Sequence, residues 1–406
     1  MKKILKDNRG SITTIVTVTA LFFSIILSTA YMVASTNRKT QLKSELTARE
    51  TYEKPLNNLD EIREEVTGLP RTAETQPYFP SSDFKRISGT DLSNGLVIED
   101  SNGNQYVWVE VPKNEDVYPT AGLNIVSFTD AEYTKIENDL HTYTSVYRNG
   151  TTYSDTWVAD NDNEGWYTEN EYYAQKKKML KSVYQNGGFY VGRYEAGITE
   201  ARTEHGYTSV VPMSKANLYP YNYVMRTQAN VLAAKVNSGN KNCSLMFGVQ
   251  WDLIMAFMHK RGNISDELLT KNSEIYGNYC NSTFKLNRGK YIQYSKYTIN
   301  STWKPITEIS LNYIDQNLNK LSQTEADGIL LTTGSSEQNK ICNIYDMAGN
   351  VWEWTLEKTS SDELQCAERG GSFPDSSSNV PMAARNANYI TLPGDLGNLG
   401  FRVSIY

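Results

Sequence analysis

The stretch NIYDMAGNVWEWT, Asn343–Thr355, decides the fold of this chain. Within it, Trp352 and Trp354 alternate with Glu353, just after a Gly-Asn pair. Glycine and asparagine favour a tight turn, and the alternation lets two large rings pack around that turn while one carboxylate points elsewhere. The stretch is therefore typical of a structural element in a core that contains many turns.

Three shorter blocks follow this stretch towards the C-terminus. They read RGGSF at Arg369–Phe373, AAR at Ala383–Arg385 and GFRVS at Gly400–Ser404. The adjacent glycines of the first block allow backbones to approach closely, and each block contributes an arginine. Because a guanidinium carries several N–H donors in a fixed plane, we expect Arg369, Arg385 and Arg402 to satisfy buried carbonyl or carboxylate groups.

The residues upstream of these blocks predict strands and helices in mixed order. At 95–112, short apolar runs flank an Asn-Gly pair, which predicts a β-hairpin, and Gly187–Ile198 predicts a second aromatic strand. Helical patterns occur at 169–186, 221–237 and 249–261. We therefore predict an α+β fold for the large C-terminal part of the chain.

The four blocks, in this order, resemble the formylglycine-generating-enzyme family, also called the sulfatase-modifying-factor family. YVWVEV, GGFYVGRYEAGI and SLMFGVQWDLIMAF resemble its earlier blocks more loosely. The resemblance covers residues 92–406, with an insertion at about 116–186. It implies a loop-rich variant of the C-type lectin fold.

The family resemblance also implies a structural calcium ion around the GNVWEW turn. Carried over, it nominates the Glu353 carboxylate with the carbonyls of Gly349 and Val351, and Asn350 as a further ligand. Hard oxygen ligands of this kind suit Ca²⁺. The alternative is that Glu353 forms a salt bridge or caps the loop without a metal.

Catalysis is not expected, because the resemblance breaks down at the catalytic cysteines. The family's enzyme binds copper through two cysteines between its RGGSW and AAR blocks, and a thiolate pair is what such soft-metal chemistry needs. Here that stretch is PDSSSNVPM, residues 374–382, without cysteine. Cys342 and Cys366 lie outside it and could instead pair as a disulfide. No HxxxH pair is present either, so we expect neither copper nor iron.

Composition narrows the classes of partner. The chain has 406 residues, a net charge of −6 and no Lys/Arg-rich run outside its N-terminal segment, which argues against nucleic acid as a partner. It contains 28 Tyr, which suits contact surfaces because tyrosine offers a large, stiff, half-polar face. The alternative is that the aromatics fill a loop-rich core.

The N-terminal part predicts a membrane anchor. Residues 11–35 form an uncharged run long enough to cross a bilayer, after a basic leader at 1–10. We interpret 36–68 as a helical stalk and 69–91 as a linker, because apolar residues at helical spacing give way to a proline-rich stretch. The large domain would then lie outside the cell, on a single-pass membrane protein.

The same N-terminus resembles a type IV pilin start. A basic leader ends in Arg9-Gly10, and an apolar helix continues into an amphipathic one. The glutamate usual at the fifth mature position is replaced by Ile15. Other pilin subunits are therefore possible partners, and pilus association is an alternative to a plain membrane anchor.

A ligand surface is expected just before the terminal GFRV block. Related domains display variable residues there, which nominates 376–398, with Asn386, Asn388 and Tyr389 as contacts. We therefore interpret the chain as a surface binding protein of the adhesin or receptor kind for an extracellular protein or glycan. One alternative is an enzyme of this family with a divergent active site, for example an oxidoreductase that uses Cys342 and Cys366. The other alternative is a structural minor pilin.

Overall fold

The structure, a computed structural model, describes most of the C-terminal part of the chain. The described residues are 68–148, 150–160, 165–204, 206, 208–236, 243–295, 298–299, 301–325, 327–389 and 397–406. They belong to one compact unit, Glu64–Tyr406. The predicted leader, membrane helix and stalk cover 1–68, and all of these residues except Gly68 lie outside the described ones. Within the described part, no helix combines the length and apolar character needed to cross a membrane.

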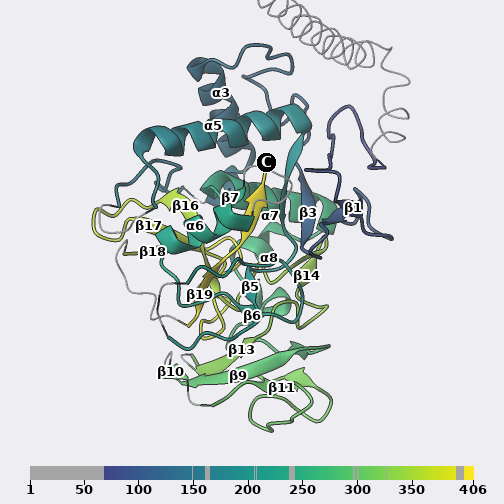
Figure 1. Ribbon diagram of the computed structural model, residues 1–406, viewed down its shortest axis with the longest axis vertical. Coiled ribbons are helices and arrows are strands. Elements are labelled where there is room, and N and C mark those ends of the chain that lie inside the picture. Colours follow the sequence, from purple (N-terminus) through teal and green to yellow (C-terminus); the bar gives the residue numbers. More distant parts are fainter. Residues whose placement is uncertain are drawn as a thin grey trace, which may run out of the picture. The chain divides into compact units, whose positions relative to one another are not determined.

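A six-stranded sheet forms the centre of this unit (Figure 1). Its order is β1 (Lys85–Arg86), β2 (Val97–Glu99), β3 (Gln105–Glu110), β4 (Gly188–Gly192), β20 (Val403–Ile405) and β7 (Cys243–Leu245). The predicted hairpin is confirmed, because β2 and β3 pair antiparallel with Val97 opposite Val107. The second predicted strand is confirmed as β4. The GFRVS block thus ends in a strand between β4 and β7.

Helices pack on this sheet and on one another. They are α3 (Asp130–Tyr143), α4 (Ser145–Arg148), α5 (Glu169–Asn186), α6 (Arg226–Val236), α7 (Gly248–Gly262) and α8 (Asp266–Thr270), with a 3-10 turn η3 (Glu274–Tyr276). The three predicted helical patterns are confirmed as α5, α6 and α7. Helix α5 begins with a capping box at Thr168 and ends at Gly187, whose φ of 65° is left-handed.

A four-stranded sheet brings the C-terminal blocks together. Its order is β18 (Arg385–Asn388), β17 (Cys366–Arg369), β16 (Trp352–Lys358) and β19 (Leu399–Phe401). The GNVWEW stretch runs into β16, which pairs parallel with β19 and antiparallel with β17. Blocks that are separate in sequence therefore become neighbours, and the segment before GFRV lies at the sheet edge in β18.

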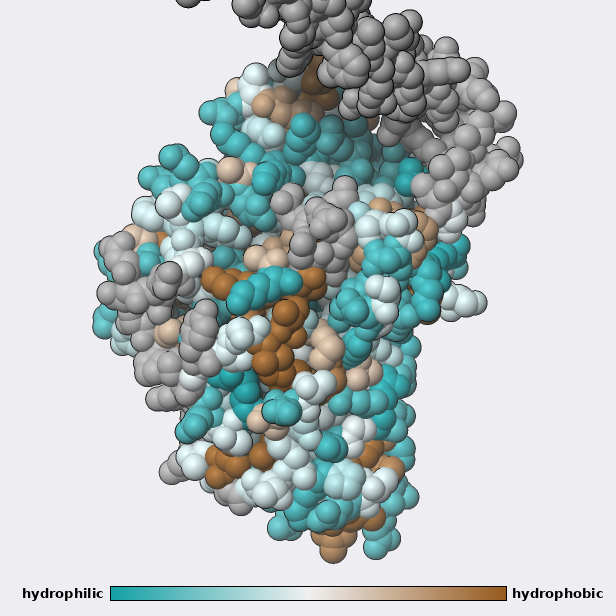
Figure 2. All heavy atoms as spheres, in the orientation of Figure 1, coloured by the Kyte–Doolittle hydropathy of each residue, from teal (hydrophilic) through white to brown (hydrophobic). Residues whose placement is uncertain are grey.

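The remaining strands are short and mostly pair in small sheets. They are β5 (Gly197–Ile198), β6 (Tyr219–Pro220), β8 (Phe284–Lys285), β9 (Lys290–Ser295), β10 (Thr298–Ile299), β11 (Lys304–Pro305), β12 (Asn319–Lys320), β13 (Asp327–Leu331), β14 (Lys340–Ile341) and β15 (Ile344–Tyr345). Figure 1 shows the sheet of β9, β10, β11 and β13 at the end of this unit opposite α3 and α5. Figure 2 shows a mainly hydrophilic face with an extended apolar area near its middle and smaller apolar areas towards its lower end.

Two segments pack more closely than the sequence suggested. Residues 69–91 lie against the domain instead of forming a free linker, because Leu69 is fully buried and Thr75 Oγ1 accepts a hydrogen bond of 2.8 Å from Trp108 Nε1. The insertion at 116–186 contributes α3, α4 and α5, and its apolar side chains join the main core. Both segments therefore stabilise the domain.

Candidate functional site

A buried ion network explains two of the three block arginines. Arg369 and Arg385 each pair with both Asp252, from α7, and Glu357, from β16, at distances between 2.5 and 3.1 Å. All four side chains are at most 7% exposed. The predicted scaffolding role is confirmed, because these guanidinium groups join α7, β16, β17 and β18 through buried carboxylates.

The third arginine lies in a separate buried cluster at the GNVWEW turn. Arg402 Nη2 is 2.7 Å from Glu353 Oε1, and its other nitrogens donate to Glu353 and to backbone carbonyls. Two further carboxyl groups, Glu195 and Asp346, are buried there. If all three acids are ionised, three negative charges face one guanidinium. Burial accordingly raises the pKa of Glu195 and Glu353, and that of Asp346 to about 6.

The turn itself is held by backbone geometry. Gly349 has a φ of 67°, and a Cβ there would lie 2.4 Å from the Asn278 carbonyl oxygen. Asn350 follows with a φ of 59°. Its amide nitrogen donates to Glu195 Oε2 at 2.6 Å, while its Oδ1 accepts from Asn278 Nδ2 and from the backbone N–H of Leu331. Both the nitrogen and the oxygen of the Asn350 side chain thus form hydrogen bonds within the protein.

The calcium ion that the resemblance implies would find suitable donors in this cluster, because carboxylate oxygens are its preferred ligands. With all three acids ionised, their surplus of two negative charges would match a divalent cation. Of the nominated ligands, Glu353 already contacts Arg402 through both oxygens, and Val351 donates its N–H to Glu195 Oε1 at 3.3 Å. Calcium at Glu353, Gly349, Val351 and Asn350 stays a prediction.

Sequence reasoning missed two acids of this cluster, Glu195 and Asp346. Both stand in the quoted blocks, in GRYEAG and in YDMAGN. An acid within an otherwise apolar and glycine-containing block was the available signal, because such a residue is rarely buried without a partner. Their place beside Glu353 depends on long-range folding and could not be deduced from spacing.

The three predicted ligand contacts line one pocket. Asn386 and Asn388 lie in β18, and Tyr389 follows directly. The cavity has a volume of about 500 Å³. Its lining residues are Trp352, Leu364, Glu368, Asp375, Val380, Asn386, Ala387, Asn388, Tyr389, Asn398 and Leu399. The structure therefore brings the predicted contacts together, and we name this cavity the Glu368 pocket.

Glu368 organises the polar side of this pocket. Asn386 Nδ2 donates to its Oε1 at 2.6 Å, and Asn388 Nδ2 donates to its Oε2 at 2.9 Å. Burial raises the pKa of Glu368 to about 7, and it also raises the pKa of Asp375. The Asn398 Oδ1 atom is buried and has no hydrogen-bond partner among the described residues. The pocket can thus exchange a proton near neutral pH and accept a hydrogen bond from a ligand.

The cysteines do not form a reactive pair. All four are described and carry free thiols, so the alternative disulfide between Cys342 and Cys366 is not formed. Burial raises the pKa of Cys342 to about 12 and that of Cys366 to about 11. Both therefore remain neutral thiols at pH 7, whereas nucleophilic and metal-binding cysteines act as thiolates.

One group of possible metal ligands lies elsewhere in the described part of the chain. Carboxylate and imidazole atoms of Glu137, His141 and Asp155 lie within 4.8 Å of one another. Glu137 is paired with Lys176 at 2.9 Å, and Asp155 accepts from the backbone N–H groups of Gly248 and Val249. Both carboxylates thus already have ion-pair or hydrogen-bond partners within the protein.

Comparison with known proteins gives a domain assignment. The solved structures that are similar include Treponema denticola variable protein 1, at 13% identity and a TM-score of 0.29; the match covers 54% of this chain and 84% of that one. They also include CarF, at 12% identity and a TM-score of 0.29; that match covers 54% of this chain and 86% of CarF. No curated protein matches. The family described as sulfatase-modifying factor enzyme 1-like domain matches residues 246–405, a shorter span than the expected 92–406. Residues 246–405, with α7 and all four C-terminal blocks, thus carry a sulfatase-modifying factor enzyme 1-like domain.

Proposed function

We propose that this chain is a surface binding protein that takes its ligand in the Glu368 pocket. The observation that carries the proposal is the pocket's composition. It combines an aromatic wall from Trp352 and Tyr389 with amide and carboxyl groups from two strands. Protein binding sites commonly pair an apolar wall with a few oriented polar groups in this way.

The ligand chemistry follows from the polar atoms. Asn386 and Asn388 are oriented by their hydrogen bonds to Glu368, so little side-chain freedom is lost on binding. The unpartnered Oδ1 of Asn398 accepts from a hydroxyl or amide of the ligand. Tyr389 is 40% exposed and offers a ring at the rim of the pocket. A neutral, hydroxyl- or amide-bearing segment of an extracellular glycan or protein suits this arrangement.

We infer a binding role, not an enzymatic one, from the same region. The segment 374–382 contains no cysteine, and the Cys342 and Cys366 thiols are held neutral by burial. These features argue against thiolate chemistry of the family's kind. The residues that line the pocket include no serine, threonine, cysteine or histidine, so none of these four side-chain types is available there as a nucleophile.

The remaining parts of the proposal concern display and stability. We infer that residues 11–35 anchor the chain in a membrane, or in a pilus together with other subunits, so that the domain lies outside the cell. Calcium would be structural, balancing the carboxylates of Glu195, Asp346 and Glu353. Neither part alters the ligand chemistry of the pocket.

Purified full-length protein on a mixed array of glycans and surface-protein fragments tests the proposal. The Asn388→Ala and Tyr389→Ala variants should each lose the wild-type signal. Asn102→Ala is the matched control, because Asn102 is an exposed residue at the turn between β2 and β3. Equal signals from all four proteins, or no bound ligand at all, would reject the Glu368 pocket as the binding site.

A further inference from the structure

The two asparagines that contact Glu368 are held to different degrees. Asn388 is buried, and its side chain forms two hydrogen bonds: Nδ2 donates to Glu368 Oε2 at 2.9 Å, and Oδ1 accepts from the backbone N–H of Tyr389 at 2.9 Å. Asn386 is exposed, and its side chain forms one, from Nδ2 to Glu368 Oε1 at 2.6 Å. Its Oδ1 has no hydrogen-bond partner among the described residues. The amide of Asn388 is therefore fixed, whereas that of Asn386 can turn.

The place of Asn386 in the sheet allows this turn. It lies in β18, the edge strand of the four-stranded sheet, directly opposite Glu368 in β17. It also lines the Glu368 pocket. Rotation about the last side-chain bond exchanges the positions of Oδ1 and Nδ2 without any change in the backbone. The same residue can thus offer a ligand either an oxygen or an N–H group.

The proton on Glu368 decides which of the two is offered. An ionised carboxylate only accepts hydrogen bonds, so Asn386 has to turn its Nδ2 towards Oε1 and leaves its Oδ1 for a ligand. A protonated carboxyl group also has an O–H to donate. Because Asn388 keeps donating to Oε2, the proton belongs on Oε1, and the Oδ1 of a turned Asn386 is its acceptor. The Asn386 Nδ2 is then left for a ligand.

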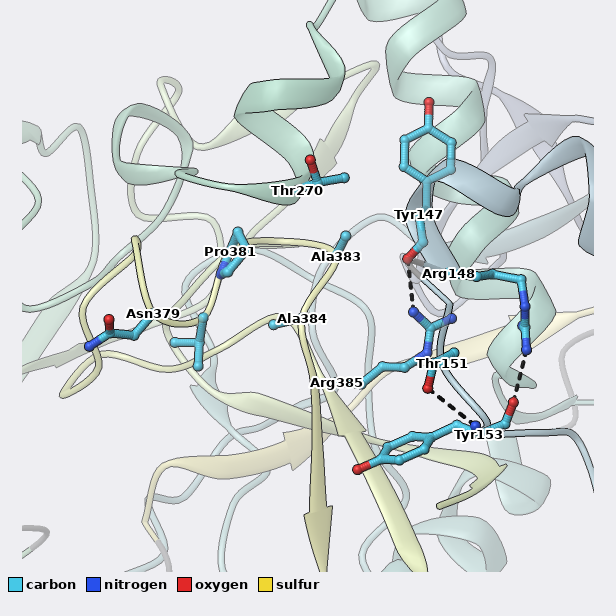
Figure 3. Close-up of a pocket in the computed structure, with 11 residues that line it drawn as sticks. Tyr147, Arg148, Thr151, Tyr153, Thr270, Asn379, Pro381, Ala383, Ala384 and Arg385 are labelled. Atoms are coloured by element: carbon cyan, nitrogen blue, oxygen red, sulfur yellow. Dashed lines mark hydrogen bonds between the residues drawn. The ribbon is translucent and has the colours of Figure 1, made fainter. Parts of the chain in front are cut away.

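The arginines next to this pair do not neutralise Glu368. Successive side chains of a strand point to opposite faces of the sheet, so Arg369 and Arg385 lie on the other face from Glu368 and Asn386. Both guanidinium groups bind the carboxylates of the buried ion network. Figure 3 shows Arg385 reaching to the Tyr147 carbonyl, on the side of α4. No lysine, arginine or histidine lines the Glu368 pocket.

The surroundings of Glu368 therefore favour its neutral form. The titratable groups that interact with its charge turn negative or stay neutral, and they are Asp375, Cys366 and Tyr153. Arg226 and Asp160, which act on Cys366, have opposite effects there. Glu368 is 3% exposed, and burial raises its pKa to about 7. Both forms of Glu368 are thus populated near neutral pH.

We propose that Asn386 sets the specificity of the Glu368 pocket, offering the ligand an acceptor when Glu368 is ionised and a donor when Glu368 is protonated. This proposal rests on the function proposed for the pocket. Above neutral pH, the position suits an amide N–H of a ligand, and below neutral pH it suits a carbonyl oxygen. A ligand hydroxyl suits both forms, because it donates and accepts. The pocket therefore selects between ligand groups according to pH.

Solvent exchange of side-chain amides tests this proposal without a ligand. It is followed by NMR on the full-length protein labelled with ¹⁵N-asparagine, and the Asn386 signal is identified by its loss in Asn386→Ala. At pH 8 most molecules keep the protected bond from Asn386 to ionised Glu368, whereas at pH 6 about one in ten does. The exchange rate of Asn386 relative to that of Asn388 should therefore be about tenfold higher at pH 6 than at pH 8. Taking the ratio removes the intrinsic effect of pH on exchange.

The matched control is Asn319, whose Nδ2 donates to Asp315 Oδ2 at 3.0 Å. Hydrogen bonds from Asn319 lower the pKa of Asp315, so this carboxylate stays ionised at both pH values and the Asn319 ratio should not change. In Glu368→Gln, an amide N–H takes the place of the acid proton, and Asn386 should exchange fast at pH 6 and pH 8 alike.

Two results would overturn the proposal. One is an Asn386 ratio in the wild type that is equal at pH 6 and pH 8. The other is a pH-dependent ratio that persists in Glu368→Gln, because the proton would then belong to another group. Failure of the pocket as a binding site would be seen separately, in the array signals of Asn388→Ala and Tyr389→Ala.

Discussion

Removal of Asp252 should destabilise the domain more than any single surface change. Asp252 is fully buried in α7 and lies within 3.1 Å of three guanidinium groups, Arg148, Arg369 and Arg385. The Asp252→Ala variant would leave Arg369 and Arg385 with Glu357 as their one contacting carboxylate in the described network, and Arg148 with no contacting carboxylate there. Breaking a buried ion pair by deleting one partner costs about 3–5 kcal/mol, because an uncompensated charge stays buried.

Chemical denaturation of the full-length protein measures this loss. The matched control is Glu267→Ala, because Glu267 and Lys271 form a salt bridge in which both side chains are more than 70% exposed. Such pairs contribute at most about 1 kcal/mol. A loss below about 1 kcal/mol for Asp252→Ala, or equal losses for the two variants, would refute the structural role of the network.

Three further predictions concern acids and backbone geometry. Because the pKa of Glu368 rises from 4.5 to about 7 on folding, the folded state binds the proton more tightly, and stability should fall as pH rises from 4.5 to 7. At about 1.4 kcal/mol per pH unit, the free energy of unfolding should fall by roughly 3 kcal/mol over this range. Denaturation curves at several pH values measure this pH dependence, and the Glu368→Gln variant should lack the part that Glu368 contributes. The same pH dependence in both proteins would contradict the prediction. Millimolar Ca²⁺ should raise the melting temperature of the wild type but not of Asp346→Asn, and an equal rise in both would argue against the acidic cluster as the calcium site. Gly187→Ala should lower the free energy of unfolding by more than about 1 kcal/mol, because φ is 65° there and a Cβ would lie 2.0 Å from the Glu74 carbonyl oxygen. An unchanged free energy of unfolding in the same assay would show that this turn can relax.

Local patterns predicted several of the longer elements of the domain. The Asn-Gly hairpin, the strand β4 and the helices α5, α6 and α7 follow from turn residues and hydrophobic spacing, which act over a few residues. The burial of 69–91 did not follow, because Thr75 is fixed by Trp108, a residue distant in sequence. Proline content describes the local chain and not what it packs against.

The candidate site was predicted in part. The segment before GFRV gave Asn386, Asn388 and Tyr389, and these do share a pocket. Glu368, which orients both asparagines, was missed because β17 and β18 pair in a register that a single sequence does not reveal. Arginines in short blocks were easier to interpret, since a buried guanidinium always needs acceptors.

Hydrogen–deuterium exchange of the full-length protein tests the binding role of the Glu368 pocket most directly. The exchange is compared with and without a ligand taken from the glycan and protein array. The account predicts slower exchange over residues 385–389, with little change in the buried helix α7. Slower exchange confined to other described segments, with 385–389 unchanged, would contradict the assignment of this pocket as the binding site.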